Sequence, residues 1–153
     1  MGLGKKQQFS FKGEIRDDSL LVGSHGDAVI KVDGTFELSG IVYCPKYTVT
    51  LSIEGDGHIA LRGICNRLII KKISGTCTLD LRDLTTKELR CESMRQKAKI
   101  LAGKTRVVTR ANLADDAVLH LMNSPLITSA ITTDNSQIIQ NNTDSFIADA
   151  SQR

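Results

Sequence analysis

The sequence contains no tryptophan, and phenylalanine and tyrosine make up only 4% of its 153 residues. An exposed aromatic surface that stacks nucleobases is therefore not expected, and the core must rest on Leu, Ile and Val. The net charge of +3 is too small to indicate a nucleic-acid-binding protein. No apolar run approaches the ~20 residues that a membrane-spanning helix needs, so no span is predicted. The sequence as given has no secretory signal, so a cytoplasmic location is the default expectation.

Motifs that would indicate catalysis or a cofactor are missing. There is no G-x-S-x-G and no phosphate-binding loop. The spacing of the four cysteines matches neither a C-x-x-C metal site nor a dense disulfide scaffold, so we predict reduced, buried thiols. The three histidines, His25, His58 and His120, are too far apart to share a metal. Arg62 and Arg82 recur at a spacing of 20, with Asp80 and Asp83 nearby, and we interpret this group as solvated charge. The sequence therefore predicts a protein that is not an enzyme and that needs no cofactor or metal.

The chain repeats itself. The segment "DGTFELSGI" at 33–41 is followed 23 residues later by "DGHIALRGI" at 56–64. At a spacing of 20 the series continues, so that Ile59 corresponds to Leu79. The repeat unit is I-x-x-x-G-x-φ-x-L-x-G-φ, where φ is apolar, and a polar turn and a second apolar segment follow it.

Within each unit the apolar residues alternate with polar ones, which places them on one face of a strand. A strand pattern that recurs every ~20 residues is typical of a β-solenoid, in which equivalent positions stack above one another. We therefore predict an all-β protein, a right-handed parallel β-helix with about five rungs of 20–23 residues. An antiparallel sandwich is the alternative, but Asp-Gly precedes the same strand in each copy instead of joining two strands in a hairpin.

The fourth rung fits the pattern least well. Leu101 extends the series from Leu81, but Lys99 then stands where an apolar residue is expected. Either the register shifts by one residue, which sends Ala98 and Ile100 inward, or the rung is bulged. We favour the shift.

The repeat sets the expected domain limits. Residues 1–27 do not fit the period and are expected to form an N-terminal arm and cap, since a solenoid must protect the unpaired backbone at its ends. Residues 28–127 form the predicted β-solenoid domain. Residues 128–153 are rich in Ser, Thr, Asn and Asp and are expected to form a polar C-terminal extension.

Basic residues are concentrated in one segment. Residues 87–110 contain eight basic and two acidic residues, whereas the rest of the chain has 12 basic and 15 acidic residues. The alternation predicts that most of these side chains point outward on consecutive rungs, as a face for an acidic ligand or as a solvated surface. The candidate ligand or partner surface consists of Arg90, Arg95, Lys97, Lys99, Lys104, Arg106 and Arg110.

The stretch "LSIEGDGHIALRGICNRLIIKKISGTCTLDLRDLTTKELRC" resembles the GIN-type auto-transporter adhesin domains, and the likeness covers roughly residues 28–121. Gly55 and Gly57 match the paired-glycine corner of that family. The resemblance implies a right-handed β-helix of a bacterial envelope or surface protein, at the cell surface or in the periplasm, with no assigned active site. The chain is also similar, less closely, to the bactofilin-like cytoskeletal solenoids.

These observations predict a non-catalytic structural or protein-interaction module that assembles with itself or binds a protein partner. The alternative is an adhesin-like binder of acidic glycan, or of another acidic ligand, through the basic 87–110 face. Nucleic acid is not an expected partner.

Overall fold

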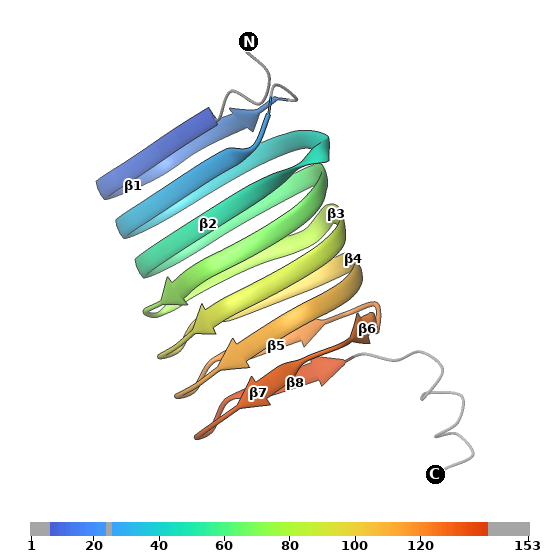
Figure 1. Cartoon of the computed structure of the whole chain (residues 1–153). Coiled ribbons are helices and arrows are strands. Elements are labelled where there is room, and N and C mark those ends of the chain that lie inside the picture. The colour runs from blue at the N-terminus through green and yellow to red at the C-terminus, as the bar shows by residue number, and fades with distance from the viewer. Residues whose placement is uncertain (1–6, 24–25, 141–153) are drawn as a thin grey trace.

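The computed structural model describes residues 7–23 and 26–140, which wind into a coil of parallel strands (Figure 1). No helix occurs among these residues. The strands are β1 (Gln7–Val22), β2 (Ala28–Ser74), β3 (Cys77–Met94), β4 (Lys99–Leu113), β5 (Val118–Leu121), β6 (Leu126–Ile127), β7 (Ala130–Thr132) and β8 (Gln137–Gln140). Because the strands continue round the bends, β2 alone holds 47 residues.

The pairs between different strands are parallel, and they join residues one turn apart in the chain. Gln7 lies beside Ala28, and Lys99 lies beside Val118, so a turn takes between 19 and 21 residues. The predicted β-solenoid is confirmed. The rung count was wrong, because the coil has about seven turns instead of five.

The additional turns lie at the two ends. β1, from the segment expected to be an arm and cap, pairs with β2 along most of its length. β7 and β8, from the expected polar extension, pair with β4 and β5. The ladder of strands therefore extends beyond both ends of the range 28–127. Residues 1–6, 24–25 (with His25) and 141–153 lie outside the described residues.

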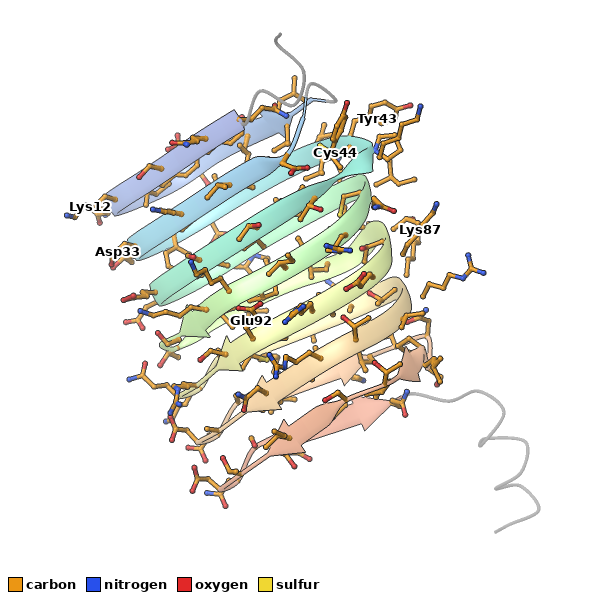
Figure 2. The ribbon with its side chains drawn as sticks, in the orientation of Figure 1. Lys12, Asp33, Tyr43, Cys44, Lys87 and Glu92 are labelled. Atoms are coloured by element: carbon orange, nitrogen blue, oxygen red, sulfur yellow. The ribbon has the colours of Figure 1, made fainter. Side chains whose placement is uncertain are left out.

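Each turn is flattened into two long sides that meet at a narrow corner and a wider return edge. Lys12 and Asp33 mark the corner, and Tyr43, Cys44 and Lys87 mark the opposite edge (Figure 2). Alternate residues of both sides point inward and stack in columns. One such column runs through Ile59, Leu79, Ile100, Leu119 and Ile138.

This column explains why single rungs need their neighbours. Leu79, Ile100 and Leu119 are fully buried, and each lies between the equivalent residues of the turns on either side. Burying such a side chain contributes about 1.5–3 kcal/mol relative to leaving it in water. The stacking of one rung on the next supplies much of that burial, so the aliphatic columns hold the coil together.

Glycines form the corner in the first four turns. Gly13, Gly34, Gly55 and Gly75 all have positive φ, between 95° and 131°. A Cβ atom on Gly34 would overlap the carbonyl oxygen of Gly13, and one on Gly55 would overlap that of Gly34. Only glycine combines this backbone conformation with so close an approach of two chains.

Later corners use a different solution. Gln96, Asp115 and Asp134 follow at the same place in the turn, and all have φ near +60°. Aspartate adopts this conformation more readily than most residues, because its short polar side chain can bond to nearby backbone. The carboxylate of Asp115 accepts a hydrogen bond from the Gln96 amide at 2.9 Å, and that of Asp134 accepts one from the Asp115 amide at 3.2 Å.

The register at the fourth rung follows the predicted shift. Ile100 lies beside Leu79, Ala98 and Ile100 are fully buried, and Lys99 is exposed. The shift of one residue is therefore confirmed. The expected column from Leu81 to Leu101 was wrong, because Leu81 lies beside Ala102.

The spacing of the first repeat differs from the spacing of the rungs. Sequence similarity aligns Phe36 with Ile59, 23 residues away. In the coil, Phe36 lies next to Gly57 and Gly34 lies next to Gly55, which are spacings of 21. A shift of two residues keeps every side chain on the same face of its strand, so both alignments place the same residues inward.

Candidate functional site

The seven residues of the predicted basic face are spread round the coil. Arg95 and Lys97 flank Gln96 at the corner, and Arg90 and Arg110 lie beside each other on one long side. Lys99 lies on the other long side, beside Thr78. A segment of 24 residues is longer than one turn, so it must encircle the coil. The structure therefore does not gather these residues on one face.

Lys104 and Arg106 are the two members that reach the return edge, defined here as residues 43–47, 64–67, 85–88 and 104–107. Lys104 lies beside Thr85, and the pairs on either side place Lys87 beside Arg106. Lys46 and Arg67 belong to this edge but lie outside the segment that the sequence singled out. The repeat period could have identified them in the sequence, because Arg67 follows Lys46 by 21 residues and precedes Lys87 by 20.

The cysteine thiols are buried and free, as predicted: Cys44, Cys65, Cys77 and Cys91. Burial raises the pKa of the Cys65 and Cys91 thiols to about 12 and that of Cys77 to about 11. These thiols stay protonated at neutral pH, and a protonated thiol is a poor nucleophile. Their part in the protein is to pack.

The two described histidines lie in different columns. His58 lies beside Thr78, whereas His120 lies beside Leu101 in a later turn. Nδ1 of His58 is 3.5 Å from a carboxylate oxygen of Glu37 on the neighbouring rung. Among residues 7–23 and 26–140, no three His, Cys, Asp or Glu side chains are arranged to hold a metal ion.

Among the ion pairs of the described residues, Asp80 and Arg82 form the one with the most hydrogen bonds. Nε and Nη2 of Arg82 donate to the two carboxylate oxygens of Asp80 at 2.9 and 2.7 Å, and the Arg82 amide donates at 3.0 Å. These hydrogen bonds hold the pKa of Asp80 below its ordinary value. Arg62, in the preceding rung, lies in register with Asp83. The four residues are therefore close together, but Asp80 and Arg82 neutralise each other.

A groove with a volume of about 480 Å³ crosses the first four turns next to this pair. Small residues, Ser39, Gly40 and Ala60, leave room for the groove, and the exposed side chains of Leu21 and Ile41 line one end. Arg62 and Asp83 line the other end. The groove offers apolar contact at one end and balanced charge at the other, and its lining includes no activated nucleophile.

The two ends of the coil differ. β1 is paired only with β2, so a strand of 16 residues has one edge with no strand beside it among the described residues. The last turn consists of β6, β7 and β8, which have two, three and four residues. Two of its inward positions become polar, since Thr132 follows Leu113 and Gln140 follows Leu121 in their columns. Ile127 and Ile138 stay apolar and are partly buried against the core.

No protein-family model, curated protein or solved structure matches this chain. The resemblance to GIN-type and bactofilin-like solenoids stays a prediction. No helix long and apolar enough to span a membrane occurs in the described part of the chain.

Proposed function

We propose that this protein is a non-catalytic structural module that associates with a second copy of itself through β1. The observation that carries this proposal is the long edge of β1. An edge strand presents a row of N–H and C=O groups that can pair with a strand of another molecule. β1 offers such a row along both sides of the first turn, whereas the short strands of the last turn offer only fragments.

Apolar side chains at the β1 end add to this argument. Phe9 and Phe11 pack against the core, but both are only partly buried. A second copy at this end would cover them. The other end also presents partly buried apolar side chains, Ile127 and Ile138, but its strands have only two to four residues and offer little backbone for pairing. The contrast favours a closed pair joined at β1 over a growing fibre, which would need two complementary ends.

The shape of β1 fixes how two copies can meet. The strand turns at Gly13, so residues 7–12 and 14–22 run in opposite directions on the two long sides. A two-fold axis through this corner places 7–12 of one copy against 14–22 of the other, in the antiparallel sense. Both long sides of the first turn then pair with the partner at the same time, and the first turns of the two copies lie directly over each other.

This arrangement brings opposite charges together. With Gly13 of one copy against Gly13 of the other, Lys12 of each copy meets Glu14 of its partner. On the inward face, Phe11 meets Ile15. Cross-strand pairs of opposite charge, and pairs of apolar residues, each contribute about 0.2–1 kcal/mol. The β1 sequence is therefore complementary to itself about this axis.

The test is the mass of the full-length protein in solution, measured over a range of concentrations for Lys12→Glu, Glu14→Lys and an equal mixture of the two. We expect the unmodified protein to form a dimer. Each variant alone brings like charges together twice and should be mainly monomeric. The mixture should recover dimers, because the introduced carboxylate of one chain then faces the introduced ammonium group of the other.

The matched controls are Lys31→Glu and Glu37→Lys, which make the same charge changes one rung further from the end. Both should remain dimeric. Glu14 also pairs with Arg16 at 2.6 Å in the monomer, so circular dichroism must show that each variant is folded. A monomer at every concentration would exclude the proposal, as would fibres. A mixture that does not recover dimers would exclude the two-fold register.

A further inference from the structure

We infer that the return edge is a binding surface for a linear acidic polysaccharide. This edge lies on the side of the coil opposite the corner, where Tyr43 and Lys87 lie (Figure 2), and it takes no part in the proposed association through β1. It also differs from the predicted basic face, because the members come from four different turns. The surface becomes visible only when the chain is wound.

Charge on the return edge is strongly one-sided. It carries one acidic residue, Glu88, against five basic residues. The basic residues are Lys46, Arg67, Lys87, Lys104 and Arg106.

The single carboxylate is already occupied. One oxygen of Glu88 lies 3.1 Å from Nε of Arg67, and the other accepts a hydrogen bond from the Thr109 hydroxyl at 2.8 Å. Within the described residues, the other four basic side chains form no ion pair, and all four are exposed. Unpaired charges of one sign on one edge produce a local positive potential that attracts anions.

The charges are arranged in a line. Lys46, Arg67 and Lys87 come from successive turns, and Lys104 and Arg106 come from the next one. Turns are spaced by about 4.8 Å, so the four turns extend over about 14 Å along the coil axis. A row of this kind suits an extended polymer with regularly spaced negative groups better than a small compact anion.

One aromatic side chain favours a sugar polymer. Tyr43 is 58% exposed and lies at the start of the row, with the partly buried Tyr47 nearby in the chain. A tyrosine ring offers an apolar face and a hydroxyl group together, which suits a sugar ring with C–H groups and hydroxyls. A single-stranded nucleic acid would need several aromatic side chains to stack successive bases.

The corner is a poorer site, although Arg95 and Lys97 lie there. The carboxylate of Asp115 accepts a hydrogen bond from the amide of Gln96, the residue between them, and the amide of Asp116 donates to the Gln96 carbonyl. Asp33 and Asp56 are exposed near earlier corners. Nearby carboxylates oppose the basic charges and repel an acidic polymer, so the return edge is the stronger attractor.

The test compares two triple variants of the full-length protein in binding to a fluorescent heparin octasaccharide at several NaCl concentrations. The edge variant carries Lys87→Glu, Lys104→Glu and Arg106→Glu. The corner variant carries Arg95→Glu and Lys97→Glu at the corner and Lys99→Glu on the adjoining long side, so its net charge equals that of the edge variant. Charge reversal should weaken the affinity of the edge variant at least about tenfold, with a shallower salt dependence. The corner variant should change less than about threefold.

Equal losses in the two variants would show that net charge alone governs binding and would overturn the inference. So would tighter binding of single-stranded DNA or polyglutamate of equal charge, or the absence of heparin binding. Circular dichroism and mass measurements accompany each titration. Because the edge residues lie outside β1, an edge variant that loses heparin but keeps its mass separates this inference from the proposed self-association.

Discussion

The carbonyl oxygen of Gly13 occupies the space that a side chain on Gly34 would need. Both residues have positive φ, but a Cβ on Gly13 itself would meet no atom within 4 Å among the described residues. Both positions therefore need a residue that tolerates positive φ, and position 34 must in addition lack a side chain.

This difference predicts unequal effects of the same substitution. Gly34→Ala should lower the free energy of unfolding by about 1–3 kcal/mol more than Gly13→Ala, because it also forces two rungs apart. Urea denaturation of the two variants measures the difference. Equal losses would mean that the turns are less closely stacked at this corner than the structure indicates.

The register of the fourth rung predicts the effect of two neighbouring truncations. Ile100 is fully buried in its column, whereas Leu101 is only partly buried on the opposite face. Ile100→Ala should lower the free energy of unfolding by about 2–5 kcal/mol, because it removes packed atoms and leaves a cavity. Leu101→Ala should cost about 1 kcal/mol or less. Chemical denaturation of both variants provides the measurement, and the reverse order would contradict the register.

The pair of Asp80 and Arg82 predicts a specific titration. The hydrogen bonds with Arg82 lower the pKa of Asp80. The pair therefore stabilises the fold fully at pH values above about 3.9, the pKa of an aspartate in the unfolded chain. That stabilisation is lost as the pH falls through the lower folded pKa. In a carboxyl-carbon NMR titration, Arg82→Ala should raise the pKa of Asp80 toward its ordinary value. Arg62→Ala is the control and should leave it nearly unchanged, because no hydrogen bond joins Arg62 to Asp80 in the described structure.

The buried thiols predict both low reactivity and sensitivity to alkali. Burial raises the pKa of Cys65 and Cys91 to about 12, so the folded protein keeps protons that the unfolded chain releases above about pH 8.5. The free energy of unfolding should therefore decrease as the pH rises from this value toward 12. A thiol reagent should label these cysteines only after addition of urea. Rapid labelling in the native state would show that the core is open.

The architecture was readable from the sequence because stacked columns need similar residues at similar spacing. Ile59 and Leu79 are neighbours at the predicted spacing of 20, and the conflict at Lys99 correctly indicated a register shift. The number of turns was underestimated because the first turn repeats only the first half of the motif, in Phe9, Gly13 and Ile15, and the last turn lacks its glycines. β1 forms a full turn although its second half does not repeat L-x-G-φ, since pairing with β2 needs only alternating inward residues.

The candidate surfaces were harder to predict. Grouping the basic residues of 87–110 assumed that neighbours in sequence are neighbours in space. In a coil, the residues beside Lys87 come from the adjacent turns. Lys46 precedes Lys87 by 41 residues, which is two turns, so the two could be grouped only with the observed spacing of 21 for the first repeat, whereas sequence similarity had suggested 23. The self-complementarity of Lys12 and Glu14 depends on the corner at Gly13, which the period did not cover.

The uniform spacing of the columns also makes the protein modular in length. Deleting residues 79–99 would place Ile100 beside Ile59 and leave the inward series of aliphatic side chains continuous. Deleting one residue fewer would turn the following side chains to the wrong face. The distance between the two ends of the coil can therefore change only by whole turns.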